Sequence, residues 1–286
     1  MKKRSEEAAV KTLLFLCSLL TVVFVAVMIL YLFIAGIPAI KEIGLKNFLL
    51  GQEWKPTADT PKYGILPFIL TSVYGTVGAV LLGVPIGILC AVFVSKIAPL
   101  AVRAVLKPIL ELLAGIPSVV FGLVGMTVLV PFVQKTFGLS DGANLFSAII
   151  VLSVMILPSI INVSENALTA VPKEYEQGSL ALGAGRVETV VKVSIPAAKS
   201  SIAASVVLGV GRAIGETMAV MMVSGNVANM PSLFKSVRFL TTAISGEMAY
   251  SSGLQRKALF SIALVLLIFL LLLNISFRLL LKGGKK

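Results

Sequence analysis

The sequence predicts an all-α membrane protein whose chain crosses the bilayer six times. Hydrophobic residues make up 57% of the 286 positions and charged residues only 13%, and the mean hydropathy of +1.01 lies well outside the range of soluble domains. Apolar runs of about 20 residues are long enough to cross a bilayer as helices. Six such runs occur, at residues 12–34, 65–94, 112–133, 145–161, 197–223 and 258–281.

The first run is predicted to be a helix of the mature protein. It is too long for the core of a signal peptide, and no small-residue cleavage site follows it. The polar segment 51–61 comes after this run and contains the single tryptophan, Trp54. Because the amphipathic indole ring favours the membrane interface, we expect Trp54 to be an anchor among the lipid headgroups.

Small residues recur every four positions in the second run, at Ala79, Gly83 and Gly87. On a helix this spacing places them on one face. A face without large side chains lets a second helix approach closely. We therefore expect Gly83 and Gly87 to mark a helix-packing surface.

The third run contains a proline followed by a serine, Pro117 and Ser118. The proline removes one backbone donor, and the serine hydroxyl can satisfy a carbonyl that the proline frees. A kink or a half-helix is expected here. Glu111, which precedes it, is expected to form an interfacial salt bridge with the nearby Lys107 or Arg103.

The longest connection, residues 162–196, mixes charged and small residues. Pro172 suits the first turn of a short helix at 173–182. Gly183 then begins a turn, and 186–194 has valines on one side, as a second short helix would. Two surface helices joined by a glycine hinge can dock a partner, or they can form a connection that only packs against the bundle.

The distribution of basic residues predicts the orientation of the chain. Most of the 25 Lys and Arg residues fall on one side if both termini are cytoplasmic, which the positive-inside rule favours. The net charge of +12 is then an orientation signal, and membrane lipid is an expected partner. The short loops cannot form a basic domain, which excludes nucleic acid.

The residue inventory excludes the common catalytic and metal centres. The chain has no histidine, and Cys17 and Cys90 lie in separate apolar runs, so neither a zinc site nor a disulfide framework is expected. It also lacks a phosphate-binding loop of the Gly-x-x-x-x-Gly-Lys-Ser/Thr type and the parts of the common hydrolytic triads. We expect neither an enzyme nor a bound cofactor.

Two charged residues, Arg212 and Glu216, lie inside the fifth run. One charge at the centre of a spanning helix costs roughly 2.5–3.5 kcal/mol. On one continuous helix the two residues share a face, so a salt bridge that fixes helix packing is one interpretation. The other is an anion path: guanidinium donors match phosphate oxygens, Thr217 adds a hydroxyl, and three nearby glycines leave space.

The long connection resembles the coupling motif of ABC-importer permeases, in which Glu-Ala-Ala, three residues, a glycine and nine residues precede Ile-x-Leu-Pro. Here Gln177-Gly178-Ser179 opens the motif, Gly183 takes the glycine position and Val193-Ser-Ile195-Pro196 closes it. Gln177 replaces the usual glutamate, although Glu176 is adjacent. The resemblance implies that an element carrying Glu176, Gln177, Gly183, Arg186 and Pro196 couples the chain to an ATPase.

Two further segments resemble the permeases of phosphate importers, namely Leu113-Ala-Gly-Ile-Pro-Ser-Val-Val-Phe-Gly122 and Gly211-Arg-Ala-Ile-Gly-Glu-Thr-Met-Ala-Val220. The stretch around Trp54-Lys-Pro56 is more similar to the PstC type than to its PstA partner. This implies a type I ABC-importer permease fold of the MetI-like class. Its expected parts are a tail, first helix and external loop at 1–64, the permease domain at 65–282 and a cytoplasmic tail at 283–286.

The resemblance also implies a function, that of the permease subunit of an ATP-driven phosphate importer in the inner membrane. The implied partners are a homologous PstA-like permease, two PstB-like ATPase subunits that use the ATP, and an external PstS-like phosphate-binding protein. Arg212 would contact phosphate, and Glu216 either accepts its proton or only steadies Arg212. Transport of another oxyanion, a gradient-driven anion carrier and a scaffold without transport are the alternatives.

Overall fold

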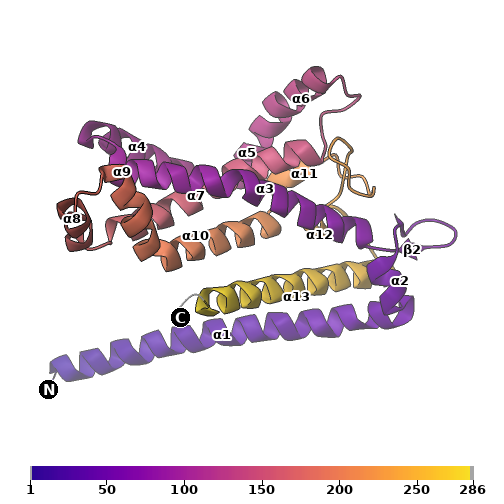
Figure 1. The fold of residues 1–286 in the computed structure, drawn as a ribbon. Coiled ribbons are helices and arrows are strands. Elements are labelled where there is room, and N and C mark those ends of the chain that lie inside the picture. The colour runs from indigo at the N-terminus through magenta and orange to yellow at the C-terminus, as the bar shows by residue number, and fades with distance from the viewer. Residues whose placement is uncertain (1, 284–286) are drawn as a thin grey trace.

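The computed structural model describes residues 2–283, and most of them are helical (Figure 1). Of the predicted tail 283–286, only Gly283 lies within the described residues. The elements, with π-helical turns written as η, are α1 Lys2–Ile43, α2 Leu45–Leu50, β1 Trp54–Lys55, β2 Lys62–Tyr63, α3 Leu66–Val92, η1 Phe93–Ile97, α4 Leu100–Gly115, α5 Ser118–Val124, η2 Gly125–Leu129, α6 Val130–Phe137, α7 Leu145–Thr169, α8 Lys173–Ala181, α9 Arg186–Thr189, η3 Val190–Ser194, α10 Ile195–Gly215, α11 Met218–Val223, α12 Leu240–Glu247 and α13 Gly253–Gly283.

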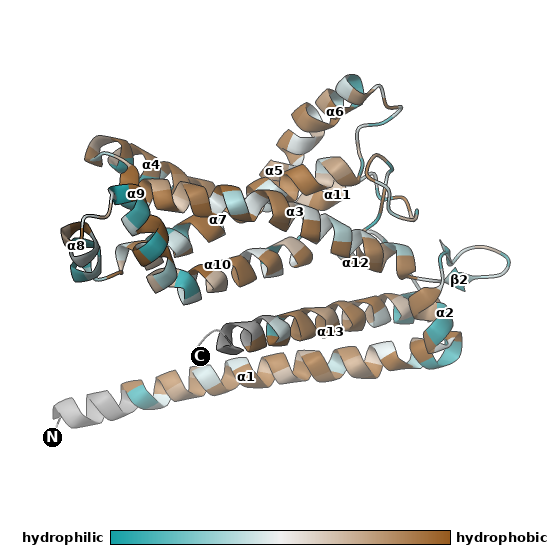
Figure 2. Cartoon of the chain, viewed as in Figure 1, coloured by the Kyte–Doolittle hydropathy of each residue, from teal (hydrophilic) through white to brown (hydrophobic). Residues whose placement is uncertain are grey.

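Six helical stretches of the described chain are long and apolar enough to cross a membrane, which confirms the predicted number of spans. They are Val10–Ile43, Leu66–Ile97, Ser118–Phe137, Leu145–Thr169, Arg186–Gly215 and Gly253–Ser276. Figure 2 shows hydrophobic residues along most of their length, whereas hydrophilic residues gather around α8 and α9 and around β2.

Two ends of the helix bundle are used as reference points below. The α8 end carries α8 and α9, and the hairpin end carries β1 and β2, which pair antiparallel with Trp54 opposite Tyr63 and Lys55 opposite Lys62. The first turns of α1 and the last turns of α13 both lie on the side of the α8 end (Figure 1). Because six spans separate them, the two termini fall on one side of the membrane.

The glycine stripe of α3 packs against α7, as predicted. A Cβ atom on Gly83 would lie 2.7 Å from Ile156 Cδ1, and one on Gly87 would lie 2.8 Å from Ile160 Cγ2. Real Cβ atoms do not approach neighbours so closely, so these isoleucines occupy the space that a side chain on α3 would need. The two helices make the central layer, and α10 packs against both.

A separate hydrophobic cluster holds the hairpin end together. Phe48, Phe68 and Leu259 are fully buried in it, and they come from α2, α3 and α13. Helix α1 lies beside α13 over a long distance (Figure 1). Ser261 Oγ of α13 donates a hydrogen bond of 2.6 Å to the carbonyl of Gly36, which fixes the register of the two helices.

Each π-helical turn is continuous with an α-helix. The turn η3 joins α9 to α10, so residues Arg186–Gly215 form one uninterrupted helix. The long connection predicted at 162–196 is therefore shorter at its C-terminal end. It is also shorter at its N-terminal end, because α7 continues to Thr169. The residues outside these two helices are therefore only 170–185, and they include α8.

Candidate functional site

Arg212 lies in the last turn of α10 and is partly buried. Its Nη1 donates a hydrogen bond of 3.2 Å to Ser159 Oγ of α7. The guanidinium lines an open recess of about 560 Å³ together with Ser159, Gly211 and Asn274, which come from α7, α10 and α13. A positive charge near the carbonyl end of a helix is favoured by the helix dipole, and the other donors of the guanidinium suit an anion.

The glycines around Arg212 do two different things. A Cβ on Gly209 would lie 3.1 Å from Ile160, so this position admits the close approach of α7. Gly211 and Gly215 have no atom within 4 Å of where a Cβ would be. The first glycine therefore serves packing, and the other two leave open space beside Arg212.

The predicted span 197–223 is not one helix, because the chain breaks between α10 and α11. Glu216 is extended, with φ −68° and ψ 132°, and α11 begins at Met218. The carboxylate oxygen Oε1 of Glu216 accepts a hydrogen bond of 3.0 Å from the backbone N–H of Ala219. Glu216, which precedes the N-cap residue Thr217, therefore satisfies one N–H of the first turn of α11, where a negative charge is favoured by the helix dipole. Thr217 Oγ1 donates to the Gly215 carbonyl at 3.3 Å.

This break overturns the expectation that Arg212 and Glu216 pair on one helix face. The four-residue spacing brings two side chains together only while the helix is continuous. Here each charge has another partner, Ser159 for Arg212 and the α11 backbone for Glu216. The ion pairs of the described residues do not include one between them. The interpretation of Arg212 and Glu216 as a salt bridge that fixes helix packing is therefore wrong.

The predicted kink at Pro117 is a complete break between α4 and α5. Helix α4 ends at Gly115, Pro117 is extended with ψ 142°, and Ser118 begins α5. The following helix packs on α11: a Cβ on Gly122 would lie 2.7 Å from the Cα of Ala219. The half-helices that follow the two breaks thus contact each other directly.

The predicted docking element consists of α8, a turn and α9 at the α8 end. The first short helix and the glycine turn are found where expected, but the predicted second short helix 186–194 is the beginning of the continuous helix Arg186–Gly215. Gly183 has φ +89°, a left-handed conformation that favours glycine. The hydroxyls of Ser179 and Thr189 lie 3.0 Å apart and join the two helices. Leu182 and Val187 expose 91% and 69% of their surface, so large apolar side chains lie uncovered among the exposed polar residues of the element.

The residues expected to couple to an ATPase fall into two groups. Gln177, Arg186 and Pro196 are exposed. Glu176 turns inward instead, where it forms an ion pair with Lys96 of η1 and accepts a hydrogen bond of 2.9 Å from Ser194 of η3. Burial raises the pKa of this carboxyl, but the hydrogen bonds from Lys96 and Ser194 outweigh it, and the net pKa lies below the usual value of 4.5.

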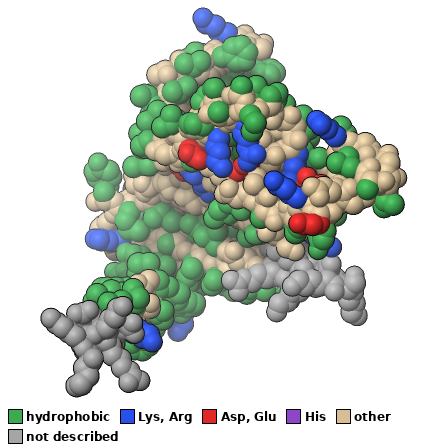
Figure 3. Space-filling model, turned by 90° about the vertical axis from the view of Figure 1, so that its left-hand side faces the viewer, with side chains coloured by type: hydrophobic (Ala, Val, Ile, Leu, Met, Phe, Trp, Pro, Cys, Tyr) green, Lys and Arg blue, Asp and Glu red, His purple; other side chains and the backbone are tan. Residues whose placement is uncertain are grey.

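A second ion cluster at the α8 end corrects the expectation for Glu111. Arg103 Nη2 and Lys107 Nζ of α4 lie 2.8 and 3.4 Å from the two carboxylate oxygens of Glu165. Glu165 belongs to α7 and is 4% exposed; two cations compensate for burying its charge. Figure 3, which views this side of the molecule, shows basic and acidic side chains gathered among hydrophobic ones.

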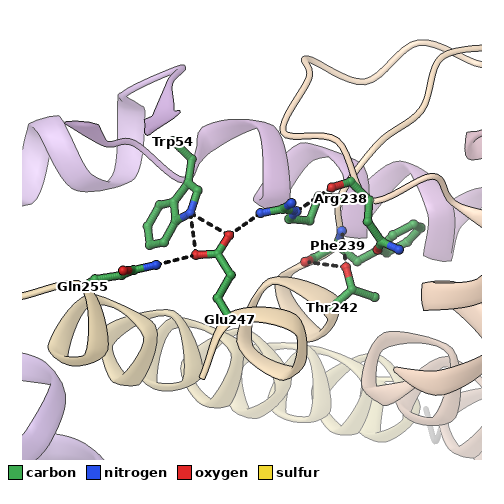
Figure 4. Close-up of polar contacts among 7 residues, drawn as sticks. Trp54, Arg238, Phe239, Thr242, Glu247 and Gln255 are labelled. Carbon is green, nitrogen blue, oxygen red and sulfur yellow. Dashed lines mark hydrogen bonds and ion pairs between the residues drawn. The ribbon is translucent and has the colours of Figure 1, made fainter. Parts of the chain in front are cut away.

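Trp54 is also placed differently from the expectation. It is 6% exposed and packs edge-on against Tyr63, with ring centroids 5.7 Å apart. Its Nε1 donates to the carboxylate of Glu247, at 3.1 and 3.0 Å to the two oxygens (Figure 4). The indole is therefore part of the protein interior at the hairpin end rather than a headgroup anchor.

Sequence reasoning missed several residues that the fold brings to these sites. Ser159 and Asn274 are polar residues inside apolar spans, a signal that would have drawn attention to them. Glu165, Thr241 and Glu247 carry weaker signals, because each has a partner far away in sequence, at 62, 25 and 193 residues respectively.

Comparison with known proteins places the chain in a family. The model of the family described as "Binding-protein-dependent transport system inner membrane component" matches residues 83–283. The chain is 41% identical over 268 residues to the probable ABC transporter permease protein YqgH of Bacillus subtilis, covering 91% of this chain and 87% of that protein. It is 32% identical over 285 residues to the phosphate transport system permease protein PstC of Haemophilus influenzae, covering 92% and 89%.

Solved structures share the fold. A chain of the bacterial alginate ABC transporter in complex with an alginate-bound periplasmic protein superimposes with a TM-score of 0.64 at 17% identity, covering 96% of this chain and 94% of that one. A chain of the MetNI methionine ABC transporter in an inward-facing conformation gives a TM-score of 0.58 at 20% identity, covering 78% and 95%. With six spans, a type I importer fold and a family match over most of its length, this chain belongs to the inner-membrane components of binding-protein-dependent transport systems and is a multi-pass permease subunit of an ABC importer.

Proposed function

We propose that the substrate of this permease is phosphate and that Arg212 contacts it during translocation. The observation that carries the proposal is the position of the guanidinium, which lines an open recess near the end of a spanning helix, just before the helix break. A planar cation in such a recess offers paired donors to a tetrahedral oxyanion. The similarity to PstC proteins supports phosphate over other oxyanions, whereas the name of the Bacillus subtilis relative includes no substrate.

The proposal includes the partners and the orientation of the chain. A PstA-like permease would complete the path, two PstB-like ATPases would bind the complex, with α8 and α9 as the contact from this chain, and a PstS-like protein would deliver phosphate at the hairpin end. ATP would be bound and hydrolysed by the ATPase subunits. The α8 end and both termini would then be cytoplasmic, in agreement with the positive-inside rule.

In this proposal the docking element transmits the closure of the ATPases to the spans. Helix α9 is continuous through η3 with α10, the helix that carries Arg212. Glu176 ties α8 to Lys96 at the end of the second span. A displacement of the docking element therefore reaches two spans directly, as alternating access between two packings requires.

The test is uptake of labelled phosphate by the complex reconstituted in proteoliposomes. We expect uptake to require ATP on the α8 side, and Arg212→Gln to reduce it to background while the complex still assembles, because glutamine keeps two donors but loses the charge. Lys135→Gln, which changes an exposed lysine in the last turn of α6, is the control for loss of one positive charge. Normal uptake by Arg212→Gln would contradict the role of Arg212, and uptake without ATP would favour a gradient-driven carrier.

A further inference from the structure

A polar cluster at the hairpin end is centred on Glu247, the last residue of α12. Three side chains from three other segments point at its carboxylate (Figure 4). Trp54 of β1 donates to both oxygens, Gln255 of α13 donates at 2.9 Å, and Arg238 forms an ion pair with it. Because a partly buried carboxylate with several donors is held in one position, the end of α12 is fixed to the external hairpin.

Arg238 connects this cluster to the segment that precedes α12. Its Nε donates a hydrogen bond of 2.7 Å to the carbonyl of Asn226, and its guanidinium carbon lies 6.0 Å from the ring centroid of Phe68, within the range of a cation–π contact. Glu247 thus joins the hairpin, the connection after α11 and the first turn of α13 at a single carboxylate.

The other end of α12 is fixed to the helix break beside the recess. Thr241, in the first turn, donates a hydrogen bond of 2.8 Å from Oγ1 to the carbonyl of Glu216. The backbone N–H of Leu240 donates to Ser72 Oγ of α3 at 3.0 Å. Thr241 is 7% exposed, so water does not readily replace this bond. The hydrogen bond from Thr241 therefore attaches the break between α10 and α11 to α12.

Helix α12 is short enough to move as one body. Thr241 and Glu247 are six residues apart, which corresponds to about 9 Å along a helix axis. The Thr242 hydroxyl accepts a hydrogen bond from the N–H of Phe239 at 3.1 Å and closes the first turn (Figure 4). Two turns with a closed end bend little, so a displacement at Glu247 reaches Thr241.

We infer that α12 is a lever that links the external hairpin to the helix break at Glu216. In this arrangement Glu247 receives the movement of the hairpin, and Thr241 is a positioning residue that sets where the Glu216 carboxylate lies beside the path. The inference rests on the proposed function, because the event at the hairpin is the docking of the external phosphate-binding protein. It adds a route from that docking to the substrate path, built from residues of this chain.

The test follows the reactivity of a cysteine at the break. Met218→Cys is introduced into a chain whose native cysteines are replaced, since Met218 begins α11 and is 50% exposed. The complete complex is reconstituted, and the rate of reaction with a small maleimide is measured. Thr241→Val, which keeps the shape and loses the donor, is expected to raise this rate about five-fold, as for the loss of one neutral hydrogen bond.

Matched variants separate a lever from general loosening. Thr241→Ser keeps the hydroxyl and should retain the original rate. Ser251→Ala removes another buried hydroxyl near α12, one that donates to the Met248 carbonyl, and should also leave the rate unchanged. Unchanged reactivity in Thr241→Val, or the same increase in Thr241→Ser, would overturn the inference.

Glu247→Gln provides the second arm, which remains decisive if Thr241→Val does not assemble. Adding the phosphate-binding protein should change the rate at Met218→Cys in the otherwise unmodified complex, and this response should be lost in Glu247→Gln. A response that persists in Glu247→Gln contradicts the lever. Phosphate uptake is measured in parallel: a complex that responds at Met218→Cys but carries no phosphate contradicts the proposed substrate and leaves the lever supported.

Discussion

At the scale of single residues, Arg212 and Glu216 are close in sequence but have different surroundings. Ser159 contacts the guanidinium and leaves it facing an open recess, whereas Glu216 uses one oxygen to cap α11. The two charges therefore do not cancel each other through an ion pair. If the proposed path passes the break, the carboxylate of Glu216 can influence both the local backbone and the choice of anion.

Substitution of Glu216 tests whether its carboxylate selects the substrate. Phosphate at neutral pH keeps at least one proton that it can donate to a carboxylate, and sulfate keeps none. Glu216→Gln retains an oxygen that can accept from Ala219, so the cap remains. We expect sulfate to compete with phosphate about ten-fold better in this variant, as for the loss of a hydrogen bond to a charged group.

The measurement for Glu216 is inhibition of labelled phosphate uptake by increasing sulfate. Glu53→Gln, which changes an exposed carboxylate on the hairpin, serves as the charge control and should leave the competition unchanged. An unaltered preference in Glu216→Gln would assign selection to the external binding protein alone.

At the scale of elements, the contact between α3 and α7 depends on the absence of side chains. Gly83→Ala would place a Cβ 2.7 Å from Ile156 Cδ1 and 3.0 Å from the Ser153 carbonyl. The carbonyl belongs to the backbone, so the helices must separate, and overpacking of this kind costs about 1–3 kcal/mol. We expect a lower thermal unfolding temperature of the purified complex.

Gly178→Ala is the matched control for the α3–α7 contact. Gly178 lies within α8 and has no atom within 4 Å of its Cβ position. Alanine in a helix is more stable than glycine by roughly 0.5–1 kcal/mol, so this variant should unfold at the same or a slightly higher temperature. Equal stability of Gly83→Ala and the unmodified chain would contradict the packing argument.

The attachment of α8 is predicted to depend on pH through Glu176. The pKa of this carboxyl is lowered in the folded chain, so its contribution to stability is present above the usual carboxyl value of 4.5 and is lost as the pH falls through the folded pKa. The stability advantage of the unmodified chain over Glu176→Gln should therefore be constant near neutral pH and disappear below about pH 4.5.

Thermal unfolding at a series of pH values, with both proteins in the same detergent, measures the effect of Glu176. Glu174→Gln controls for the loss of a negative charge, because Glu174 is exposed and lies two residues before Glu176 on the same helix. A difference between unmodified chain and Glu176→Gln that does not change with pH would show that the ion pair with Lys96 does not stabilise α8.

At the scale of the whole molecule, the orientation of the chain is open to direct labelling. In a cysteine-free background, Thr57→Cys places a thiol in the exposed loop of the hairpin, and Leu182→Cys places one at the exposed turn of the α8 end. We expect a membrane-impermeant maleimide to label Thr57→Cys in intact cells and Leu182→Cys only after permeabilisation. The reverse pattern would overturn the assignment of cytoplasmic termini.

The sequence predicts the architecture well, because the length of a membrane span and the face of a helix are both determined by residues that are close together in the chain. The six spans, the stripe at Gly83 and the turn at Gly183 all follow from residues close together in the chain. The break at Glu216 escapes this reasoning, since an apolar run does not reveal that a carboxylate caps a new helix. The partners of Trp54 and Glu165 depend on which spans become neighbours, and that is decided by packing across the whole bundle.

The π-helical turn η3 decides where the chain can lose a residue. A π turn holds one residue more than the α-helix around it would need, and η3 lies between α9 and α10. Each residue of an α-helix rotates the chain by about 100°, so a deletion within α10 would turn the exposed side of α9 by that angle relative to Arg212. A deletion within η3 removes the surplus residue instead, and the wide turn can close to an ordinary α-helical turn. Between Arg212 and the α8 end, η3 is therefore the place where one residue can be lost while the side that the α8 end presents to its partner is kept.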